Sequence, residues 1–190
     1  MKKELPFYIT RYQENWGIRT LKKGKMLLIA GDIANQIFYI ESGIVRVFIY
    51  NERTKKEDTM SFLATNNTMI PLVNFLIDDK NPTIINVEVL EDAIIHSTTI
   101  EFWKEMEQKD SELLEFRNSL IMKVFLLLLE HNSDVRSLDA TTHYKKLLAK
   151  FDFIERIKNE YVASYLGIDE ATFSRIKSKI KAKASKKQTE

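Results

Sequence analysis

Hydrophobic and polar positions change their period along the chain, and this change divides it into two halves. From residue 25 to about 96, short runs of β-branched and aromatic residues are broken by turn formers. Val45, Val47 and Ile49 alternate with other side chains, as expected for a strand that buries one face. Strands are predicted at residues 26–30, 37–40, 45–50, 57–62, 84–89 and 93–96. This spacing predicts an antiparallel roll or barrel.

Turn-forming residues separate the predicted strands. Turns are expected at 31–32, 41–43 and 51–53 because these segments are rich in Gly, Asp, Asn and Ser. The acidic pairs Asp78-Asp79 and Glu91-Asp92 also fall at predicted turns. We therefore expect solvated carboxylates there, not catalytic ones.

After His96 the hydrophobic period becomes that of a helix. Ser111 is expected to cap a long helix from 112 to about 131, whose second half is apolar nearly all round. Such a surface favours burial against a second copy of the chain, so we expect a homodimer. The predicted dimer interface consists of Leu113, Phe116, Leu120, Val124, Leu127 and Leu128.

Polar interruptions follow this helix, at 132–134 and 137–139, and predict a hinge. We place a domain boundary there. The expected division is a roll at 1–110, a dimerisation helix at 111–134 and a DNA-binding unit at 135–190. Three further helices are expected in the last unit, at about 142–151, 159–166 and 170–183.

The last two of these helices have the pattern of a helix-turn-helix. Two crossing helices need a small residue at their closest approach, a turn residue that tolerates positive φ, and apolar anchors on both sides. Ala163 and Gly167 meet the first two demands, and Asp169 can cap the second helix. The expected anchors are Val162, Leu166, Ile168, Phe173 and Ile176.

The remaining face of the second helix carries candidate DNA contacts. The first turns of a recognition helix face base edges, and arginine can grip guanine through two donors. Arg175 is therefore the best candidate for base contact, with hydroxyl and lysine side chains as candidates for phosphate contact. The predicted DNA-binding residues are Asp169, Glu170, Ala171, Thr172, Ser174, Arg175, Lys177 and Lys179. The alternative is a helical hairpin that only packs, with solvated lysines on its outer face.

Composition and charge narrow the possible classes of protein. The chain has 190 residues, of which 44% are hydrophobic and 29% charged, as in a folded globular protein. The net charge is only +2, but basic residues gather after Phe173, where the only acid is Glu190. The absence of cysteine excludes disulfides, thiolate metal sites and a cysteine nucleophile, and it fits a cytoplasmic protein. The longest apolar run, at 124–129, is too short to span a membrane.

Candidate catalytic chemistry is sparse. The three histidines, His96, His131 and His143, stand apart in the sequence without metal-ligand spacing, so no metal site is expected. His96 is expected at a strand end and His131 at a helix end. With five glycines far apart and no arginine between Arg53 and Arg117, a glycine-rich phosphate cradle is not expected either. We predict no enzyme activity and no cofactor.

The segments around Gly24, Gly31-Asp32 and Gly43, in this order with the helix-turn-helix, resemble the Crp/Fnr family of bacterial transcription regulators. The resemblance runs from about residue 21 to 180, and the segment from His143 to Ile168 looks most like Bacteroidetes-type members. It implies an α+β fold. A cyclic-nucleotide-binding-like antiparallel β-roll, or double-stranded β-helix, is joined by a long dimerisation helix to a C-terminal helix-turn-helix. The family's wing strands are not evident, since a lysine-rich tail follows the recognition helix, so a full wing is not expected.

The sequence departs from this family where cyclic nucleotide would bind. The resemblance places a Gly-Glu pair at 69–72 and an arginine step at 81–84, but neither the Glu nor the Arg is present. Cyclic AMP is therefore not the expected effector. The degenerate pocket is expected near Met69, Ile70, Leu72, Val73, Thr83 and Ile84. It either accepts an unidentified effector, binds a nucleotide by rearranged contacts, or is filled by its own side chains.

A second departure concerns base recognition. Ala171 stands where the family has an acidic base reader, so the usual operator should not be assumed. Altogether the sequence predicts a homodimeric transcription regulator that binds DNA, with RNA polymerase and a small-molecule effector as further candidate partners. The alternative is an effector-sensing β-roll, or one with a protein partner, that does not bind DNA.

Overall fold

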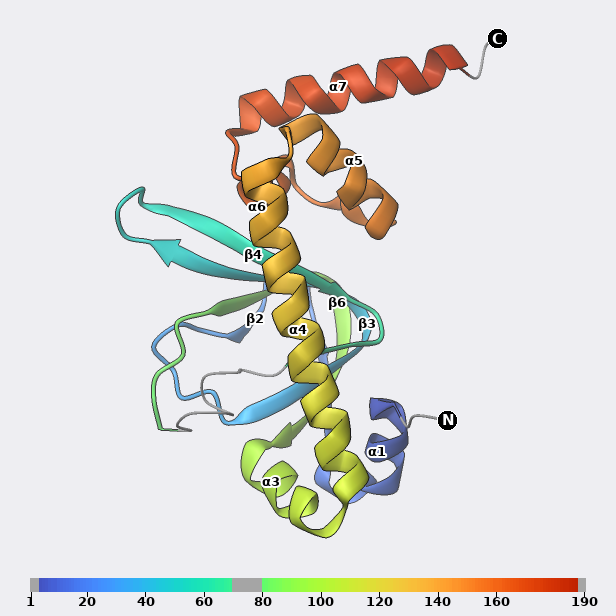
Figure 1. The fold of residues 1–190 in the computed structure, drawn as a ribbon. Coiled ribbons are helices and arrows are strands. Elements are labelled where there is room, and N and C mark those ends of the chain that lie inside the picture. Colours follow the sequence, from blue (N-terminus) through green and yellow to red (C-terminus); the bar gives the residue numbers. More distant parts are fainter. Residues whose placement is uncertain (1–3, 70–79, 188–190) are drawn as a thin grey trace.

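Two long antiparallel strands, β3 (Gln36–Asn51) and β6 (Asn86–Thr99), form the centre of the fold (Figure 1). The computed structural model describes residues 4–69 and 80–187. The sheet order is β1-β6-β3-β4, where β1 is Gly17–Leu21 and β4 is Lys56–Ala64. Two short strands complete it: β2 (Met26–Leu28) pairs with β6, and β5 (Asn67–Met69) pairs with β3. The predicted antiparallel roll is confirmed.

Two of the predicted turns are wrong, because residues 41–43 lie within β3 and 91–92 within β6. The pairing of the two strands shifts register at three points between Ile40 and Val45, as in a series of bulges. Gly43 makes this possible with a φ of +99°. A Cβ atom at Gly43 would lie 2.6 Å from the Cβ of Ala93, so only glycine lets the strands cross so closely.

Apolar side chains that point inward from these strands fill the interior of the roll. Ile40, Val45, Val87, Val89 and Ile95 are all fully buried. Strand β1 was not predicted, because Gly17 has no side chain and Arg19 and Thr20 are polar, which leaves no apolar run. In the structure Ile18 is exposed. Strand β1 belongs to the sheet through its pairing with β6, and of its side chains Leu21 packs against the core of the roll.

A second core lies under the helices at the base of the roll. Helix α1 (Leu5–Arg11), the short 3-10 helix η1 (Gln13–Asn15) and α3 (Ile100–Lys109) surround Trp16 and Trp103, which meet edge to face. Tyr8 and Leu113 are buried in the same cluster. Helix α1 was also absent from the predicted elements.

Helix α4 (Ser111–Ser137) runs from this base across the sheet to the C-terminal helices (Figure 1). Its cap is Asp110 and not Ser111, because the Asp110 carboxylate accepts hydrogen bonds from the amides of Glu112 and Leu113. The helix also continues past its predicted end at 131. Polar residues at 132–134 do not interrupt it, since Ser137 donates to the Ser133 carbonyl and Asp134 forms an ion pair with Lys146.

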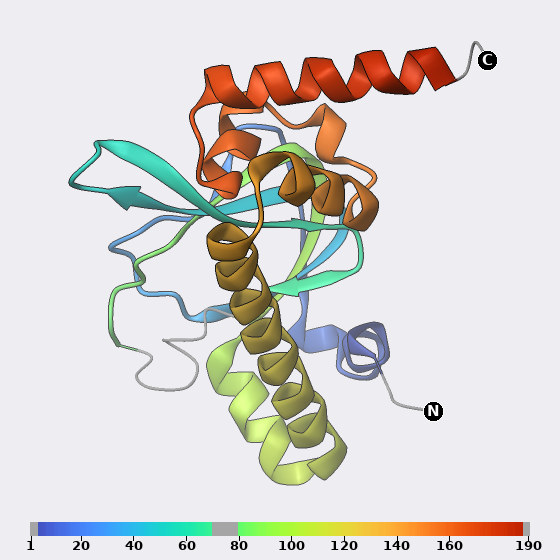
Figure 2. The same cartoon turned by 45° about the horizontal axis from the view of Figure 1, so that its top comes forward.

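The C-terminal helices are α5 (Ala140–Lys150), η2 (Ile154–Arg156), α6 (Asn159–Leu166) and α7 (Glu170–Lys187). The predicted bounds of α6 and the start of α7 are confirmed. Figure 2 shows α7 along the outer edge of the molecule, away from the sheet. Helix α7 continues to Lys187, where the described part of the chain ends. Within the described ranges, no helix is long and apolar enough to span a bilayer.

The C-terminal helices pack directly on the roll. Ile44, Phe62 and Leu90 of the sheet share one buried cluster with Val162 and Phe173 of the helices. The roll and the helical unit therefore share a common core. The predicted boundary at 134/135 falls inside α4, which continues to Ser137.

Candidate nucleic-acid interface

The turn between α6 and α7 has the geometry that a helix-turn-helix requires. Helix α6 ends at Gly167, whose φ of +70° is left-handed and whose amide donates to the Ser164 carbonyl. The amide of Ile168 donates to the Ala163 carbonyl, which closes the helix end. Phe173 of α7 is 0% exposed and meets the Tyr144 ring edge to face at 4.9 Å between centroids. The predicted anchors Val162, Leu166 and Phe173 are buried, and Ile168 and Ile176 pack against them.

Two of the predicted DNA contacts, Asp169 and Thr172, bind each other. The Asp169 carboxylate accepts from the Thr172 amide at 2.8 Å and from the Thr172 hydroxyl at 2.7 Å. These hydrogen bonds lower the pKa of Asp169. The pair caps α7, as predicted for Asp169, and fixes the first turn of the helix.

Lys177 is turned toward α6. Its Nζ donates to Asn159 Oδ1 at 2.9 Å and lies 5.8 Å from the centroid of the Phe173 ring. Burial, followed by the charge of Lys181, lowers the pKa of Lys177. In this position Lys177 braces the crossing of the two helices.

The outer face of α7 is left to a smaller set of side chains. Glu170, Ala171, Arg175 and Lys179 are exposed, and Ser174 is half-buried. Further along, Lys181 lies 3.4 Å from Glu155. Arg175 therefore stands among exposed side chains one turn after the capped start of α7.

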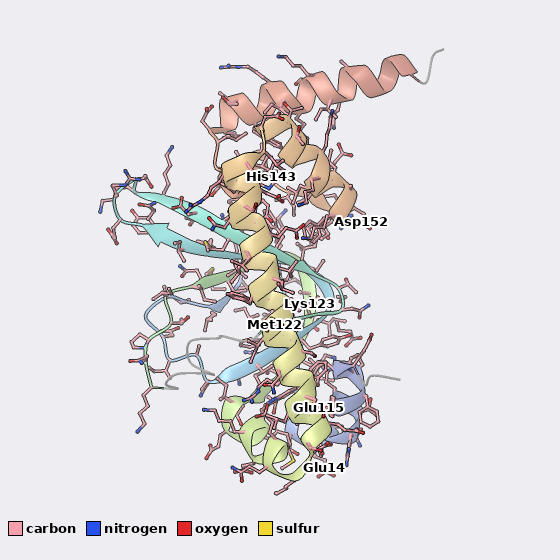
Figure 3. All side chains as sticks on the ribbon, viewed as in Figure 1. Glu14, Glu115, Met122, Lys123, His143 and Asp152 are labelled. Atoms are coloured by element: carbon pink, nitrogen blue, oxygen red, sulfur yellow. The ribbon has the colours of Figure 1, made fainter. Side chains whose placement is uncertain are left out.

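The predicted dimer face on α4 is largely uncovered in the single chain. Figure 3 labels Met122 and Lys123 midway along α4. From this point toward the C-terminal end of α4, large apolar side chains are exposed by between 40% and 56%: Met122, Phe125, Leu126, Leu127, Leu128 and Leu129. An apolar surface of this length on a single helix is typical of an interface between subunits.

Not all predicted interface residues lie on this surface. Leu127 and Leu128 are exposed, Leu120 and Val124 are half-buried, and Phe116 packs on the Trp103 ring. Leu113 is only 1% exposed and lies in the core at the base of the roll. Leu113 is thus corrected from a dimer contact to a core residue, because α3 folds back over the first turn of α4.

Arg46 joins the roll to the helix-turn-helix, which the sequence did not predict. The side chain is 1% exposed and forms ion pairs with Glu57 and with Glu88, the latter at 3.1 Å. Its guanidinium lies 4.0 Å from the Phe48 ring centroid and 3.6 Å from that of Tyr161 in α6. Arg46 alternates with Val45 and Val47 along β3, so the sequence pattern predicts that its side chain faces the solvent. Here α6 covers that face of the strand.

Further hydrogen bonds fix the same contact. The Ser164 hydroxyl accepts from the Thr59 amide and donates to the Glu57 carbonyl, both at 2.8 Å. Arg156 binds both carboxylate oxygens of Glu91 at 2.7 and 3.2 Å. Glu91 is therefore an interdomain partner and not a solvated turn residue.

The predicted effector pocket can be followed only in part. Ile70, Leu72 and Val73 lie outside the described residues, as do Asp78 and Asp79, and Met69 is described only as part of β5. Thr83 is buried and its backbone bonds to Gly31 and Asp32, whereas Ile84 is 70% exposed. Nearby, a hollow of about 250 Å³ is lined by residues between Met26 and Phe38, including Asp32 and Asn35.

The histidines are not isolated in space. His96 pairs with Glu41 within the sheet. His131 lies inside α4, not at its end, because the helix extends to Ser137, and its ring centroid is 5.9 Å from that of His143. In the described part of the chain, no three histidine, aspartate or glutamate side chains are arranged to hold a metal ion.

Comparison with known proteins identifies the fold. No protein-family model matches this sequence, and no curated protein matches it. Among solved structures, FixK2 from Bradyrhizobium japonicum is similar with a TM-score of 0.76 and 12% identity, covering 89% of this chain and 86% of its own. The regulator CLP of Xanthomonas campestris has a TM-score of 0.76 and 15% identity, with 94% and 93% covered.

A third structure, a mutant of CooA from Carboxydothermus hydrogenoformans, has a TM-score of 0.73 and 17% identity, covering 96% of this chain and 86% of its own. A regulator from Eubacterium rectale with similar scores is described as a member of the Crp/Fnr family. The chain therefore has the fold of Crp/Fnr-type regulators, with the β-roll, long helix and C-terminal helices in the same arrangement.

Proposed function

We propose that this protein is a sequence-specific DNA-binding transcription regulator that acts as a homodimer. The observation that carries the proposal is the exposed Arg175 on α7, one turn after a capped and rigidly packed helix start. Such a helix can enter the major groove, where arginine donates two hydrogen bonds to guanine. Binding to DNA would place the protein in the cytoplasm.

A two-fold axis along α4 would bring two copies of α7 to one side of the dimer. The exposed apolar side chains of α4, from Met122 to Leu129, supply the surface that a second copy would cover. The operator would then be a pseudo-palindrome with half-sites about 34 Å apart. Bound there, the dimer would either recruit RNA polymerase or block it.

The contacts of α7 suggest distinct roles for the predicted DNA-binding residues. Arg175 reads a base, whereas Glu170, Ala171, Ser174 and Lys179 are available to contact the groove or the phosphates. Asp169, Thr172 and Lys177 act mainly by holding α7 in place, because their polar atoms already have partners. This division separates residues that set specificity from residues that set geometry.

We propose that the roll does not respond to cyclic AMP. The glutamate and arginine that the family resemblance requires are missing from the sequence at 69–72 and 81–84. In the described part of the roll, Thr83 is held by backbone bonds and Ile84 faces outward. The name of the similar CLP protein describes that protein as responsive to c-di-GMP, so effectors other than cyclic AMP occur on this fold.

The test is a binding titration with Arg175→Ala. Genomic fragments that bind the full-length protein are first selected and sequenced, and the recovered operator is labelled for anisotropy. We expect Arg175→Ala to weaken specific binding by about 1–3 kcal/mol, or roughly 5- to 150-fold. Arg53→Ala, which removes one exposed positive charge from the turn between β3 and β4, is the matched control and should bind normally. Unchanged affinity of Arg175→Ala would remove Arg175 from the reading role.

A second function is an effector-sensing roll whose helical unit binds a protein. The hollow between Met26 and Phe38 and the core shared by the roll and the helices favour this candidate. It is distinguished by salt dependence. Lysine and arginine contacts to phosphate make DNA affinity fall steeply with ionic strength, whereas this second function predicts no salt-dependent retention on duplex DNA.

A further inference from the structure

Three aromatic rings from three different helices meet where the long helix joins the C-terminal unit. His131 of α4 is stacked on Tyr165 of α6, with ring centroids 4.1 Å apart and an interplanar angle of 28°. His143 of α5 lies 5.9 Å from His131 and 6.0 Å from Tyr165. Figure 3 labels His143 beside the end of α4 that meets the C-terminal helices. The cluster thus joins α4, α5 and α6.

The His143 imidazole is buried and that of His131 is half-buried. His143 is 3% exposed, and the buried Nδ1 atom of His131 has no hydrogen-bond partner among the described residues. Burial lowers the pKa of His143, and burial together with the neighbouring His143 lowers that of His131. The closed cluster therefore favours two neutral rings.

The charged groups around the cluster are already paired. Glu130 and Asp134 of α4 accept ion pairs from Lys146 of α5, at 2.8 and 2.7 Å, and Lys150 of α5 binds Glu130 at 2.9 Å. From α6, Tyr165 contributes a neutral phenol whose burial raises its pKa to about 12. Among the described residues, the charge of Asp134 opposes the lowering of both histidine pKa values, and Asp134 is itself paired with Lys146.

We propose that this cluster, formed by His131, His143 and Tyr165, is an acid-sensitive junction whose protonation detaches the C-terminal helices from α4. Two positive imidazolium rings in contact would repel each other and require water. Opening relieves both costs, since separated helices expose both rings. Tyr165 also contacts Phe62 of β4 at 5.6 Å, so opening would loosen the helical unit from the roll as well.

This inference does not depend on DNA binding. The junction sets how the C-terminal unit sits on the long helix, whatever that unit binds. If the proposed function holds, acidity becomes an input to the orientation of α7. If it fails, the response of the junction to pH can still be measured.

Hydrogen exchange of the full-length protein, followed by mass spectrometry at pH 7.5 and 5.5, tests the junction. Exchange in peptides from α5 and α6 is compared with peptides from β6 after correction for the intrinsic pH dependence of exchange. In the open state an imidazole titrates with the ordinary pKa of 6.5, whereas in the closed state it stays neutral. At pH 5.5, protonation of one histidine therefore shifts the equilibrium toward the open state on the order of tenfold. We expect opening of α5 and α6 to increase by up to that factor for each histidine, with little change in β6.

Variants assign the effect to the two rings. The double variant His131→Gln/His143→Gln should lose the pH-dependent opening. The matched control is His96→Gln, which removes the remaining histidine, in the sheet. This variant should keep the pH-dependent opening. If the double variant does not fold, His131→Phe preserves a ring against Tyr165 without a titrating group and should lose about half of the logarithmic response. The proposal would be overturned if the wild type showed no pH-dependent opening, or if the variants without the two imidazoles opened as fully as the wild type.

Discussion

The guanidinium of Arg46 lies 3.6 Å from the centroid of the Tyr161 ring, and this contact joins the β-roll to the helix-turn-helix. The centroid of the Phe48 ring lies at 4.0 Å, so the charge is in contact with two aromatic rings. The carboxylates of Glu57 and Glu88 both form ion pairs with it. A cation in this setting stabilises the contact only while its carboxylates and rings stay in place, because it is desolvated.

Replacing Arg46 by methionine should therefore destabilise the protein. The variant keeps an apolar stem between the rings but leaves Glu88, whose side chain is only 20% exposed, without its cation. We expect a loss of about 2–3 kcal/mol in the free energy of unfolding, below the full cost of a buried pair because Glu57 is exposed. Urea unfolding followed by circular dichroism measures it.

The control for Arg46→Met is Tyr161→Phe. That variant preserves the ring over Arg46 and removes only the hydroxyl that accepts from Lys158 at 3.3 Å. It should cost less than about 1 kcal/mol. Equal losses for both variants would show that the ring contact with Arg46 is not the main stabilising feature.

Local signals were sufficient for some elements and not for others. The bounds of α6 followed from nearby residues, because Gly167 ends the helix by its own φ and Asp169 caps the next one. The burial of Arg46 could not be predicted in this way, since Tyr161 lies more than a hundred residues away in the sequence. The same holds for His131 and His143, which stand apart in the chain and meet only when α5 folds back on α4.

Gly43→Ala should be among the most damaging single substitutions in the roll. Its Cβ would approach the Cβ of Ala93 to 2.6 Å and the carbonyl of Asp92 to 2.7 Å, at a φ of +99°. Backbone strain and overpacking together predict a loss of about 3–5 kcal/mol. Gly24→Ala is the matched control, because its φ is +82° but nothing lies within 4 Å of the added atom. The control should lose only about 1–2 kcal/mol, and similar losses for both would mean that Ala93 can move aside.

Asp169→Ala should affect the stability of α7 more than the choice of bases. The substitution removes the acceptor for the Thr172 amide and hydroxyl, so the first turn of α7 loses its cap. We expect the melting temperature to fall by roughly 2–4 °C. Asp169→Asn, which can still cap, should restore the melting temperature. If DNA selected by Asp169→Ala has a different sequence from that selected by the wild type, Asp169 contacts bases directly.

Leu126→Glu should convert the proposed dimer into a monomer. Leu126 is 56% exposed on the apolar face of α4, and a two-fold interface would bury the new carboxylate in both subunits. We expect the dissociation constant to rise at least about 100-fold in sedimentation equilibrium. Ile29→Glu introduces the same charge at a residue of the roll that is 48% exposed, and it should leave the dimer intact. Should the wild type itself sediment as a monomer, the apolar face of α4 needs a different partner.

The ion pairs of Glu130 predict a second loss of stability at lower pH than the histidine junction. Hydrogen bonds from Lys146, then from Lys150, lower the pKa of Glu130 from 4.5 to about 2. At pH values between these two, the unfolded chain binds a proton that the folded chain does not, so the stabilisation is complete above 4.5 and is lost as the pH falls toward 2. Glu130 is 40% exposed, and solvent screening should limit the effect to less than about 1 kcal/mol.

Glu130→Gln should flatten this part of the unfolding profile. Glu105→Gln removes an exposed carboxylate of α3 and should leave the profile unchanged. The decline below pH 7 that belongs to His131 and His143 should persist in Glu130→Gln, because a buried neutral imidazole loses its advantage as soon as the unfolded chain is protonated near 6.5. A profile that changes only in the upper range would instead mean that Glu130 acts through the histidines.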